Sequence, residues 1–401
     1  MKNKWANRRL ADIGTLLTGS TPNTSEKDMF GDFIPFIKPG DLNSDGSLNY
    51  ENEGLSNSGL STARLIPPGA VLMVCIGATI GKCGFSERNI VTNQQINTII
   101  PSAKVSNKFI YYQMLADRFQ RQVILNSAQA TLPIINKSKW GELTVAVPDS
   151  LPEQQRIVGI LDKAFAGLAV AVANAEKNLQ NAHALFESHL QAVFTQRGEG
   201  WEEKPLEAVA SILNGYAFKS TDFSAKEGTK CIKITNVGVR EFVPTSDGYL
   251  PESFAAEYEK VSVKEGNIVL ALTRTIIAGG LKVAVVPEEY DGALLNQRVA
   301  SIIANDKDLN GAFLFGYLST QTVVDYVKER VNTLMQPNLS ITDLRSMPIP
   351  APPRREQNKI TGQLDELREA TQRLTSIYEK KLAALAELKK SLLHQAFRGE
   401  L

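Results

Sequence analysis

The stretch Leu151-Pro152-Glu153-Gln154-Gln155-Arg156-Ile157-Val158 marks a change of pattern in this chain. The turn-rich sequence before it stops, and apolar residues then recur at spacings of three and four. This spacing predicts one long amphipathic helix, and Pro152 suits its first turn, where the missing N–H costs nothing. The predicted apolar stripe consists of Ile157, Leu161, Ala164, Leu168, Ala171, Ala175, Leu179, Ala182, Phe186, Leu190 and Val193.

The same motif returns in the second half of the chain as Arg355-Glu356-Gln357-Asn358-Lys359-Ile360. A second helical stripe follows it: Ile360, Leu364, Leu367, Thr371, Leu374, Tyr378, Leu382, Leu385, Leu388 and Leu392. Trp5 is matched by Trp201, 196 positions later, and further matches follow in the same order at offsets that drift from 197 to 203. The sequence therefore predicts an internal repeat with loop insertions in its second copy.

The segment ahead of each long helix has a different texture. Short apolar runs alternate there with clusters of Gly, Pro, Asn and Ser, which is typical of strands, and one short helix is expected near Lys108–Val123. The predicted strands of the first copy are Phe33–Ile37, Val71–Ile76, Ile96–Ile100 and Leu143–Val147. The expected organisation is α+β: a strand-rich head at 1–150, a helix at 151–199, a second head at 200–352 and a second helix at 353–401.

The two helical stripes are too long to be buried by their own heads. A stripe of about 40 residues extends over roughly 60 Å. We therefore expect the helices to pair as an antiparallel coiled coil related by a pseudo-two-fold axis, with the heads at opposite ends and the chain termini close together. Two independent domains on separate spacer helices are the alternative.

Composition excludes several classes of protein. Forty-four Lys and Arg against 43 Asp and Glu give a net charge of +1, so the chain is no general electrostatic binder of nucleic acid. Cys75, Cys83 and Cys231 fit neither a disulfide framework nor a structural metal site and favour a reducing compartment. We find no secretory leader and no run of about 18 apolar residues, so we expect a cytoplasmic protein without a membrane partner.

Two similar heads on a spacer are suited to reading two sites at a set separation, and double-stranded DNA offers sites at a regular interval of about 34 Å. Arg and Lys suit phosphate or guanine, while Asn and Gln suit adenine. For Asn93-Gln94 and Asn296-Gln297, support of the loop backbone is an equally good reading. The polar loops Ala128–Thr131 and Asn332–Met335 are additional candidates. The candidate DNA-binding residues are Lys38, Thr79, Lys82, Asn93, Gln94, Lys219, Lys233, Asn236, Arg274, Asn296, Gln297 and Arg298.

Over its whole length the chain resembles the specificity subunits of type I restriction-modification enzymes. The motifs that carry this resemblance are Leu10–Gly14, Thr18–Pro22, Pro35–Leu42, Gly77–Lys82, Asn93–Gln95 and, most specifically, Val147–Val158. The second copy departs from them, because Tyr216–Lys219 replaces Ser20–Pro22 and Leu272–Thr275 stands near the Gly-Ala-Thr position. This divergence implies that the two heads read different sequences.

The resemblance implies a subunit with two target recognition domains, each reading half of a bipartite, asymmetric DNA site. It also implies that the helices dock two methyltransferase subunits, which use S-adenosylmethionine to methylate adenine. A motor and nuclease subunit that uses ATP and Mg²⁺ would join the complex. We expect no catalytic residues, metal or cofactor in this chain itself.

Two rival functions remain open at this point. One is a coiled-coil protein scaffold that does not bind DNA, and the other is an enzyme with a cryptic site. The residues give the enzyme little support, because the histidines (His183, His189 and His394) all fall on the predicted helices. Gly77–Lys82 also lacks the spacing of a phosphate-binding loop.

Overall fold

The computed structural model describes residues 5–127, 132–223, 227–331 and 338–401. The chain forms two compact units, 1–176 with 380–401, and 177–379, so each unit holds one head and half of each long helix. The first head consists of β1 (Trp5–Arg9), α1 (Leu10–Ile13), β2 (Gly14–Thr18), η1 (Lys27–Met29), β3 (Phe30–Ile37), η2 (Pro39–Asp41), β4 (Gly54–Leu55), α2 (Asn57–Ser61), β5 (Val71–Val74), β6 (Cys83–Phe85), β7 (Val91–Thr92), β8 (Ile96–Pro101), α3 (Asn107–Leu115), α4 (Asp117–Asn126), α5 (Lys137–Gly141) and β9 (Thr144–Pro148).

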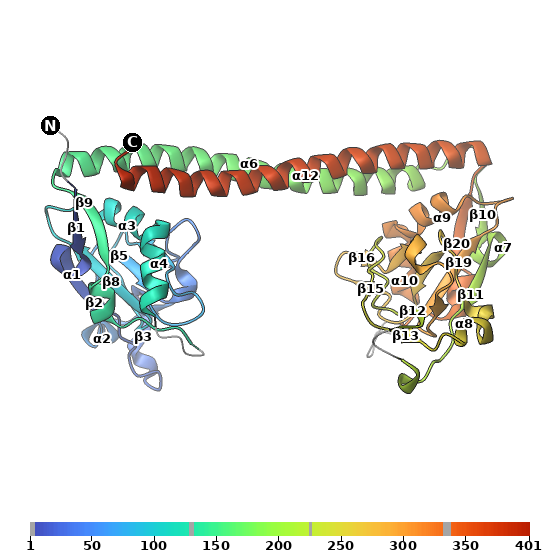
Figure 1. Cartoon of the computed structure of the whole chain (residues 1–401), viewed down its shortest axis with the longest axis horizontal. Coiled ribbons are helices and arrows are strands. Elements are labelled where there is room, and N and C mark those ends of the chain that lie inside the picture. The colour runs from blue at the N-terminus through green and yellow to red at the C-terminus, as the bar shows by residue number, and fades with distance from the viewer. Residues whose placement is uncertain (1–4, 128–131, 224–226, 332–337) are drawn as a thin grey trace. The chain divides into compact units, whose positions relative to one another are not determined.

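The second head repeats this order of elements, which confirms the predicted duplication and the strand-rich α+β character of the heads (Figure 1). It consists of β10 (Glu202–Pro205), α7 (Leu206–Val209), β11 (Ala210–Asn214), η3 (Ser220–Asp222), β12 (Thr229–Ile232), β13 (Tyr249–Leu250), α8 (Phe254–Glu257), η4 (Glu259–Val261), β14 (Ile268–Ala271), β15 (Ile276–Ile277), β16 (Gly280–Leu281), β17 (Val283–Val285), η5 (Glu288–Tyr290), β18 (Leu294–Leu295), β19 (Val299–Ala304), α9 (Gly311–Leu318), α10 (Gln321–Arg330), α11 (Ile341–Arg345) and β20 (Pro348–Ala351).

The sheets of the two heads have matching strand orders. The four-stranded antiparallel sheet is β2-β8-β5-β6 in the first head and β11-β19-β14-β17 in the second. A three-stranded sheet, β4-β3-β7 or β13-β12-β18, and a two-stranded pair, β1-β9 or β10-β20, complete each head. Strands β3 and β7 run parallel, as do β12 and β18. The drift in offset has a structural cause, since the hairpin β15–β16 is inserted between β14 and β17 and the second head gains further residues before β18.

The central sheet is buried on both faces, which explains why β5 is a continuous apolar run rather than an alternating one. In the first head, Val71 and Met73 face a core that includes α3, while Leu72 and Val74 pack towards the second sheet. Figure 1 shows α3 and α9 directly beneath the long helices of their units.

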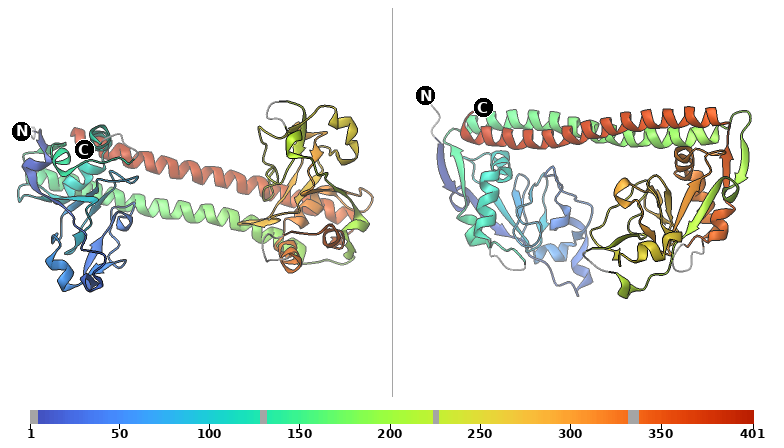
Figure 2. Two further views of the ribbon diagram at one scale, coloured as in Figure 1. Left: turned by 90° about the horizontal axis from the view of Figure 1, so that it is seen from below. Right: turned by 45° about the vertical axis from the view of Figure 1, so that its right-hand side comes forward.

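The long helices are α6 (Leu151–Thr195) and α12 (Arg354–Arg398). The core of the first head contains Leu161 near the start of α6 and Leu393 near the end of α12. The core of the second contains Leu364 near the start of α12 and Leu190 near the end of α6. The helices therefore run antiparallel within each unit, as predicted, and they lie side by side there (Figure 2).

The ends of the described chain meet in the first unit. A Cβ placed on Gly399 would lie 3.5 Å from Nε1 of Trp5, and Arg156 donates a hydrogen bond to the carbonyl of Leu401. The predicted proximity of the two termini is thus confirmed.

A buried glutamine joins each head to its helix. Gln154 accepts a hydrogen bond from the Ser106 backbone N–H (2.7 Å) and donates one to the Pro148 carbonyl (3.0 Å). Gln357 makes the same contacts in the second head, with the Asn310 N–H (2.7 Å) and the Pro352 carbonyl (2.8 Å). The repeated Glu-Gln motif therefore fixes the start of each long helix against its head.

Two details differ from the sequence prediction. The single helix expected near Lys108–Val123 is two helices, because Ala116 is extended and Gln120 donates a hydrogen bond to the Met114 carbonyl at the end of α3. Leu374 and Leu388 of the predicted α12 stripe are exposed. Lys389 packs against α6 instead, with its Nζ 5.5 Å from the ring centre of Phe165 on that helix.

Helix α6 is long and apolar enough, by length and composition alone, to cross a membrane. Its most apolar 18-residue window has a mean hydropathy of 1.6 and is 17% buried. This is weak evidence for a membrane span, because the same helix contributes Ile157 and Leu161 to the core of the first head and Leu190 to that of the second.

The buried glutamine makes a testable prediction about stability. Gln154→Ala would leave the Ser106 N–H and the Pro148 carbonyl without partners in a buried site, so we expect a loss of about 2 kcal/mol in unfolding free energy. The neighbouring Gln155 is exposed, and Gln155→Ala should change stability by less than about 0.5 kcal/mol. Urea unfolding, with hydrogen exchange at the Ser106 amide, measures both; equal effects of the two variants would contradict this role.

Candidate nucleic-acid interface

In the first head, four loops that are distant in the sequence meet at one end of the central sheet. The Cys75 N–H donates to the Gln95 carbonyl (2.8 Å), the Gly19 N–H to the Ile96 carbonyl (3.1 Å), and the Gly77 N–H to the Pro133 carbonyl (3.0 Å). We call residues 19–20, 75–82, 93–95 and 132–135 the first loop cluster.

The second head forms the corresponding second loop cluster from residues 215–216, 272–275, 296–298 and 338–339. The Leu272 N–H donates to the Arg298 carbonyl (2.8 Å), the Leu339 N–H to the Leu272 carbonyl (2.9 Å), and the Gln297 N–H to the Tyr216 carbonyl (2.9 Å). The Leu272 bond repeats that of Cys75, and the Leu339 bond repeats that of the Ile135 N–H to the Cys75 carbonyl (2.9 Å), so both heads present loops of the same origin at the same end of the sheet.

Glycine is required where the clusters close. A Cβ on Gly19 would lie 2.1 Å from the Asn93 carbonyl oxygen, and a Cβ on Gly215 would lie 2.1 Å from that of Asn296. Any larger residue would push the loops apart. The repeated Leu-X-Gly sequence thus has a structural role at the interface.

The structure brings most of the candidate residues to these clusters. Thr79, Lys82, Asn93 and Gln94 belong to the first, and Arg274, Asn296, Gln297 and Arg298 to the second. Lys38 and Lys233 lie beside them, because the Asn93 N–H bonds to the Ile37 carbonyl and the Asn296 N–H to the Ile232 carbonyl. Lys219 is exposed after the Tyr216–Phe218 aromatic pair. The loops Ala128–Thr131 and Asn332–Met335 lie outside the described residues.

Two of the candidate asparagines support backbone instead of facing solvent. Asn236 is fully buried; it accepts from the Lys233 N–H (2.9 Å) and donates to the Val243 carbonyl (2.9 Å). Asn93 is also buried, and its amide bonds to the side chain and N–H of Gln95. A side chain placed in this way has no free edge for a ligand, so this geometry argues against direct DNA contact by these two residues. Asn296 is half-buried and accepts from the Arg298 N–H (3.3 Å).

Lys38 and Lys233 already have acidic partners. Lys38 pairs with Glu53, and Lys233 pairs with Asp247 at 3.4 Å. Their charges are partly neutralised, whereas the side chains of Thr79, Gln94, Arg274, Gln297 and Arg298 are exposed. Gln94 accepts a hydrogen bond from Thr21 Oγ1, so the other four are the ones positioned to meet a ligand without rearrangement.

Lys282 is a further candidate residue, which the sequence did not indicate. The Val74 N–H bonds to the Lys82 carbonyl (2.8 Å), and the Ala271 N–H bonds to the Lys282 carbonyl (3.1 Å), so the two lysines are equivalent. Burial, and then the charge of Arg274, lower the pKa of Lys282. The inserted β15–β16 hairpin shifts the offset here and hid this correspondence in the sequence.

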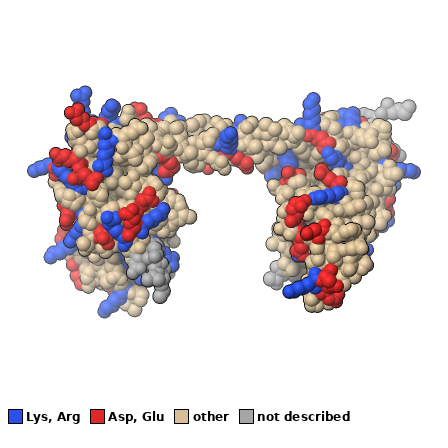
Figure 3. All heavy atoms as spheres, turned by 180° about the vertical axis from the view of Figure 1, so that it is seen from behind, with Lys and Arg blue, Asp and Glu red and all other residues tan. Residues whose placement is uncertain are grey.

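Charge is mixed on the face of each head that Figure 3 shows. Figure 3 shows Lys and Arg interspersed with Asp and Glu on the face in view, without a broad region of one sign. Recognition of DNA would therefore depend on particular side chains more than on a general positive field.

The described residues offer little catalytic chemistry. No group of three or more His, Cys, Asp or Glu residues there is placed to hold a metal ion. The three cysteines are free and buried, and burial raises the pKa of the Cys75 and Cys231 thiols to about 12.

A family model described as "Type I restriction modification DNA specificity domain" matches residues 2–178 and again residues 198–383. The chain belongs to the type I restriction-modification specificity subunits.

Individual relatives agree with this assignment. The chain is 22% identical to the type I restriction enzyme MjaVIII specificity subunit of Methanocaldococcus jannaschii, over 99% of this chain and 93% of that one. It is 30% identical to the EcoAI specificity subunit of Escherichia coli over 45% of this chain and 30% of that one.

Two solved structures share the fold. One, from a study of complex assembly and conformational transition of the type I R-M system, aligns with a TM-score of 0.81 at 15% identity and covers 99% of this chain and 98% of that one. The HsdS subunit from Thermoanaerobacter tengcongensis aligns with a TM-score of 0.59 at 16% identity, covering 100% and 98%.

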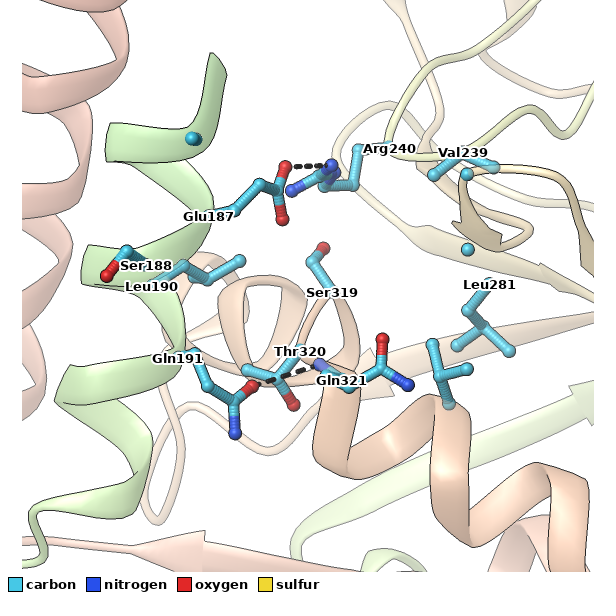
Figure 4. Close-up of a pocket in the computed structure, with 14 residues that line it drawn as sticks. Glu187, Ser188, Leu190, Gln191, Val239, Arg240, Leu281, Ser319, Thr320 and Gln321 are labelled. Atoms are coloured by element: carbon cyan, nitrogen blue, oxygen red, sulfur yellow. Dashed lines mark hydrogen bonds and ion pairs between the residues drawn. The ribbon is translucent and has the colours of Figure 1, made fainter. Parts of the chain in front are cut away.

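The second unit of this specificity subunit contains a cavity of about 670 Å³ between α6, the 239–240 loop, the β15–β16 hairpin and the start of α10 (Figure 4). Arg240 pairs with Glu187 on one side of it. On the other, Gln191 of α6 accepts from the Gln321 N–H (3.1 Å) and donates to Thr322 Oγ1 (3.0 Å). These polar contacts join the second head to α6. The residues that line the cavity include no nucleophile paired with a base.

Substitution of Arg240 tests how much these contacts between the second head and α6 stabilise the second unit. Its backbone is left-handed (φ 58°), a conformation that alanine tolerates poorly and glycine adopts freely. Arg240→Ala should destabilise the second unit by about 1–2 kcal/mol, because the Glu187 pair and the contact with the Phe186 ring are lost.

Arg240→Gly loses the same contacts but relieves the backbone strain, so it should be about 1 kcal/mol more stable than Arg240→Ala. Unfolding free energies from urea titration decide the order. A glycine variant less stable than the alanine variant would show that the strain is not present.

Proposed function

We propose that this chain is the DNA-recognition subunit of a type I restriction-modification complex, with each head reading one half of a bipartite, asymmetric site in double-stranded DNA. The observation that carries the proposal is that the two loop clusters share one backbone scaffold, while the second carries two exposed arginines that the first lacks. Gly77 and Gln95 of the first cluster correspond to Arg274 and Arg298 of the second. A common scaffold with different side chains suits one class of ligand with two different sequences.

We further propose that the long helices set the spacing between the half-sites and dock two methyltransferase subunits. Both helices carry exposed apolar side chains, among them Val170 and Leu185 on α6 and Ile377 and Leu388 on α12. Exposed apolar positions of this kind are typical of surfaces that bind another protein. A motor and nuclease subunit would join through the assembled complex.

In this proposal the chain has no catalytic activity of its own. S-adenosylmethionine, ATP and Mg²⁺ would bind to the partner subunits, and the complex would act on DNA in the cytoplasm. The buried cysteines and the placement of the three histidines on the long helices support this division of labour.

The alternative is a coiled-coil protein scaffold that does not bind DNA. The mixed surface charge and the exposed apolar positions of the helices favour it as much as they favour the leading proposal. The DNA-recognition subunit and the scaffold differ in how salt affects binding to a duplex, because only a DNA-binding protein releases counterions from it.

The salt response gives a direct prediction. For the purified complex with its methyltransferase, we expect affinity for duplex DNA containing the site to fall steeply with salt, with a log–log slope of about −0.9 for each phosphate contact. Fluorescence anisotropy between 50 and 300 mM salt measures this slope. Absence of binding to any duplex at low salt would favour the scaffold.

Methylation mapping tests specificity. Cells that express this chain with its methyltransferase should carry a bipartite adenine-methylated motif that is absent from cells with the methyltransferase alone. Exchange of residues 1–150 for the first head of another specificity subunit should change one half of the motif and leave the other half intact. A motif that survives this exchange unchanged would refute the two-headed reader.

A further inference from the structure

Two non-glycine residues in the described part of the chain have a left-handed backbone, and both are arginines of the second head. Arg240 has φ 58° and Arg274 has φ 50°. An L-residue pays conformational free energy in this region, and such a conformation persists only where the surroundings impose it. Each of the two arginines therefore needs an explanation.

Contacts inside the protein account for Arg240. Its guanidinium pairs with Glu187 and lies 5.8 Å from the ring centre of Phe186, and the side chain is only 25% exposed. The left-handed backbone at Arg240 thus brings its guanidinium to Glu187 on α6.

Arg274 has no such compensation. Its side chain is exposed, and among residues 5–127, 132–223, 227–331 and 338–401 it makes no hydrogen bond, ion pair or ring contact. Arg274 lies close enough to Lys282, a group of the same charge, to help lower the pKa of that lysine. The free protein therefore holds an arginine in an unfavourable backbone conformation next to another cation.

The backbone on either side of Arg274 is fixed. Thr273 forms a β-bridge with Asn338, and the Lys282 N–H donates to the Thr275 carbonyl at 2.8 Å. Thr275 itself is fully buried. The turn is thus a rigid support for one outward-facing side chain.

The first head shows what the fold needs at this position. Ile76 forms the bridge with Ile134 that corresponds to Thr273 with Asn338, so Gly77 is the equivalent of Arg274. Gly77 also has a positive φ, 106°, which glycine adopts freely. The turn requires the left-handed conformation, but it does not require an arginine.

We infer that Arg274 is a specificity-determining residue that reads a guanine in the half-site of the second head. The inference rests on the proposed function. A guanidinium held on a rigid turn can bond to both O6 and N7 of guanine in the major groove, whereas a phosphate contact needs no such fixed direction. Arg298 and Lys282 lie on the adjoining loops and supply positive charge for the nearby backbone phosphates.

Arg274→Gly is the decisive variant, because it restores the residue of the first head and removes the strain, so the fold should be retained. The full chain with its methyltransferase is measured against a panel of duplexes in which each base pair of the second half-site is changed. The wild-type complex should disfavour replacement of one G·C pair by about ten-fold or more. The glycine variant should lose that discrimination and keep the first half-site unchanged.

Two further variants separate base reading from charge. Arg274→Lys keeps the charge but not the paired donors, so the salt slope should persist while discrimination at the G·C pair falls. Lys307→Ala removes an exposed cation at the end of β19 that lies away from the second loop cluster. It should change neither the salt slope nor the discrimination at the G·C pair.

The inference is overturned if Arg274→Gly weakens binding to all sequences equally, which would identify a phosphate contact, or if it leaves the recognition profile unaltered. Failure of the proposed function gives a different result, since the wild-type complex would then bind no sequence preferentially.

Discussion

Each head of this protein completes its hydrophobic core with the ends of both long helices. In the first head, Leu161 of α6 and Leu393 of α12 pack into one cluster, and Leu364 and Leu190 do the same in the second. The first core therefore includes Leu393 and Ala396 of the second repeat, and the second core includes Leu190 and Phe194 of the first. Neither repeat completes its core from its own residues, and contacts over such sequence distances are slow to form. The buried glutamines then fix where each helix leaves its head.

The elements that could be predicted are those in which local pattern and tertiary structure agree. The helical stripes and the apolar runs satisfy this condition, because each depends on residues close in sequence. The duplication is visible because the same motifs return in the same order in the second half of the chain. The break at Ala116 depends on Gln120 reaching back to the Met114 carbonyl, and the exposure of Leu388 depends on Lys389 packing over Phe165. Contacts of this kind have no periodic signal, so sequence alone could not reveal them.

The candidate site was predictable by residue type but not by role. An asparagine that suits adenine also suits a loop backbone, and only burial separates the two, as it does for Asn236. The charge of Lys38 and Lys233 suits a phosphate, but their acidic partners Glu53 and Asp247 lie on neighbouring segments that the sequence does not place. Lys282 was missed because an inserted hairpin disrupted the alignment of the two repeats.

Comparison of the two heads indicates how specificity can change while the fold is kept. The residues that shape the loop clusters are shared: Gly19 and Gly215 allow the close approach, and Asn93 and Asn296 each accept a hydrogen bond from the backbone N–H two residues later in their own loop. Arg274 stands where the first head has Gly77, on a turn whose geometry is set by backbone bonds that involve no side chain at that position. A substitution there alters what the head presents to a ligand without removing a core contact. In the proposed function, stability and recognition would depend on different residues of the same loops, so the two heads could differ in sequence preference on one scaffold.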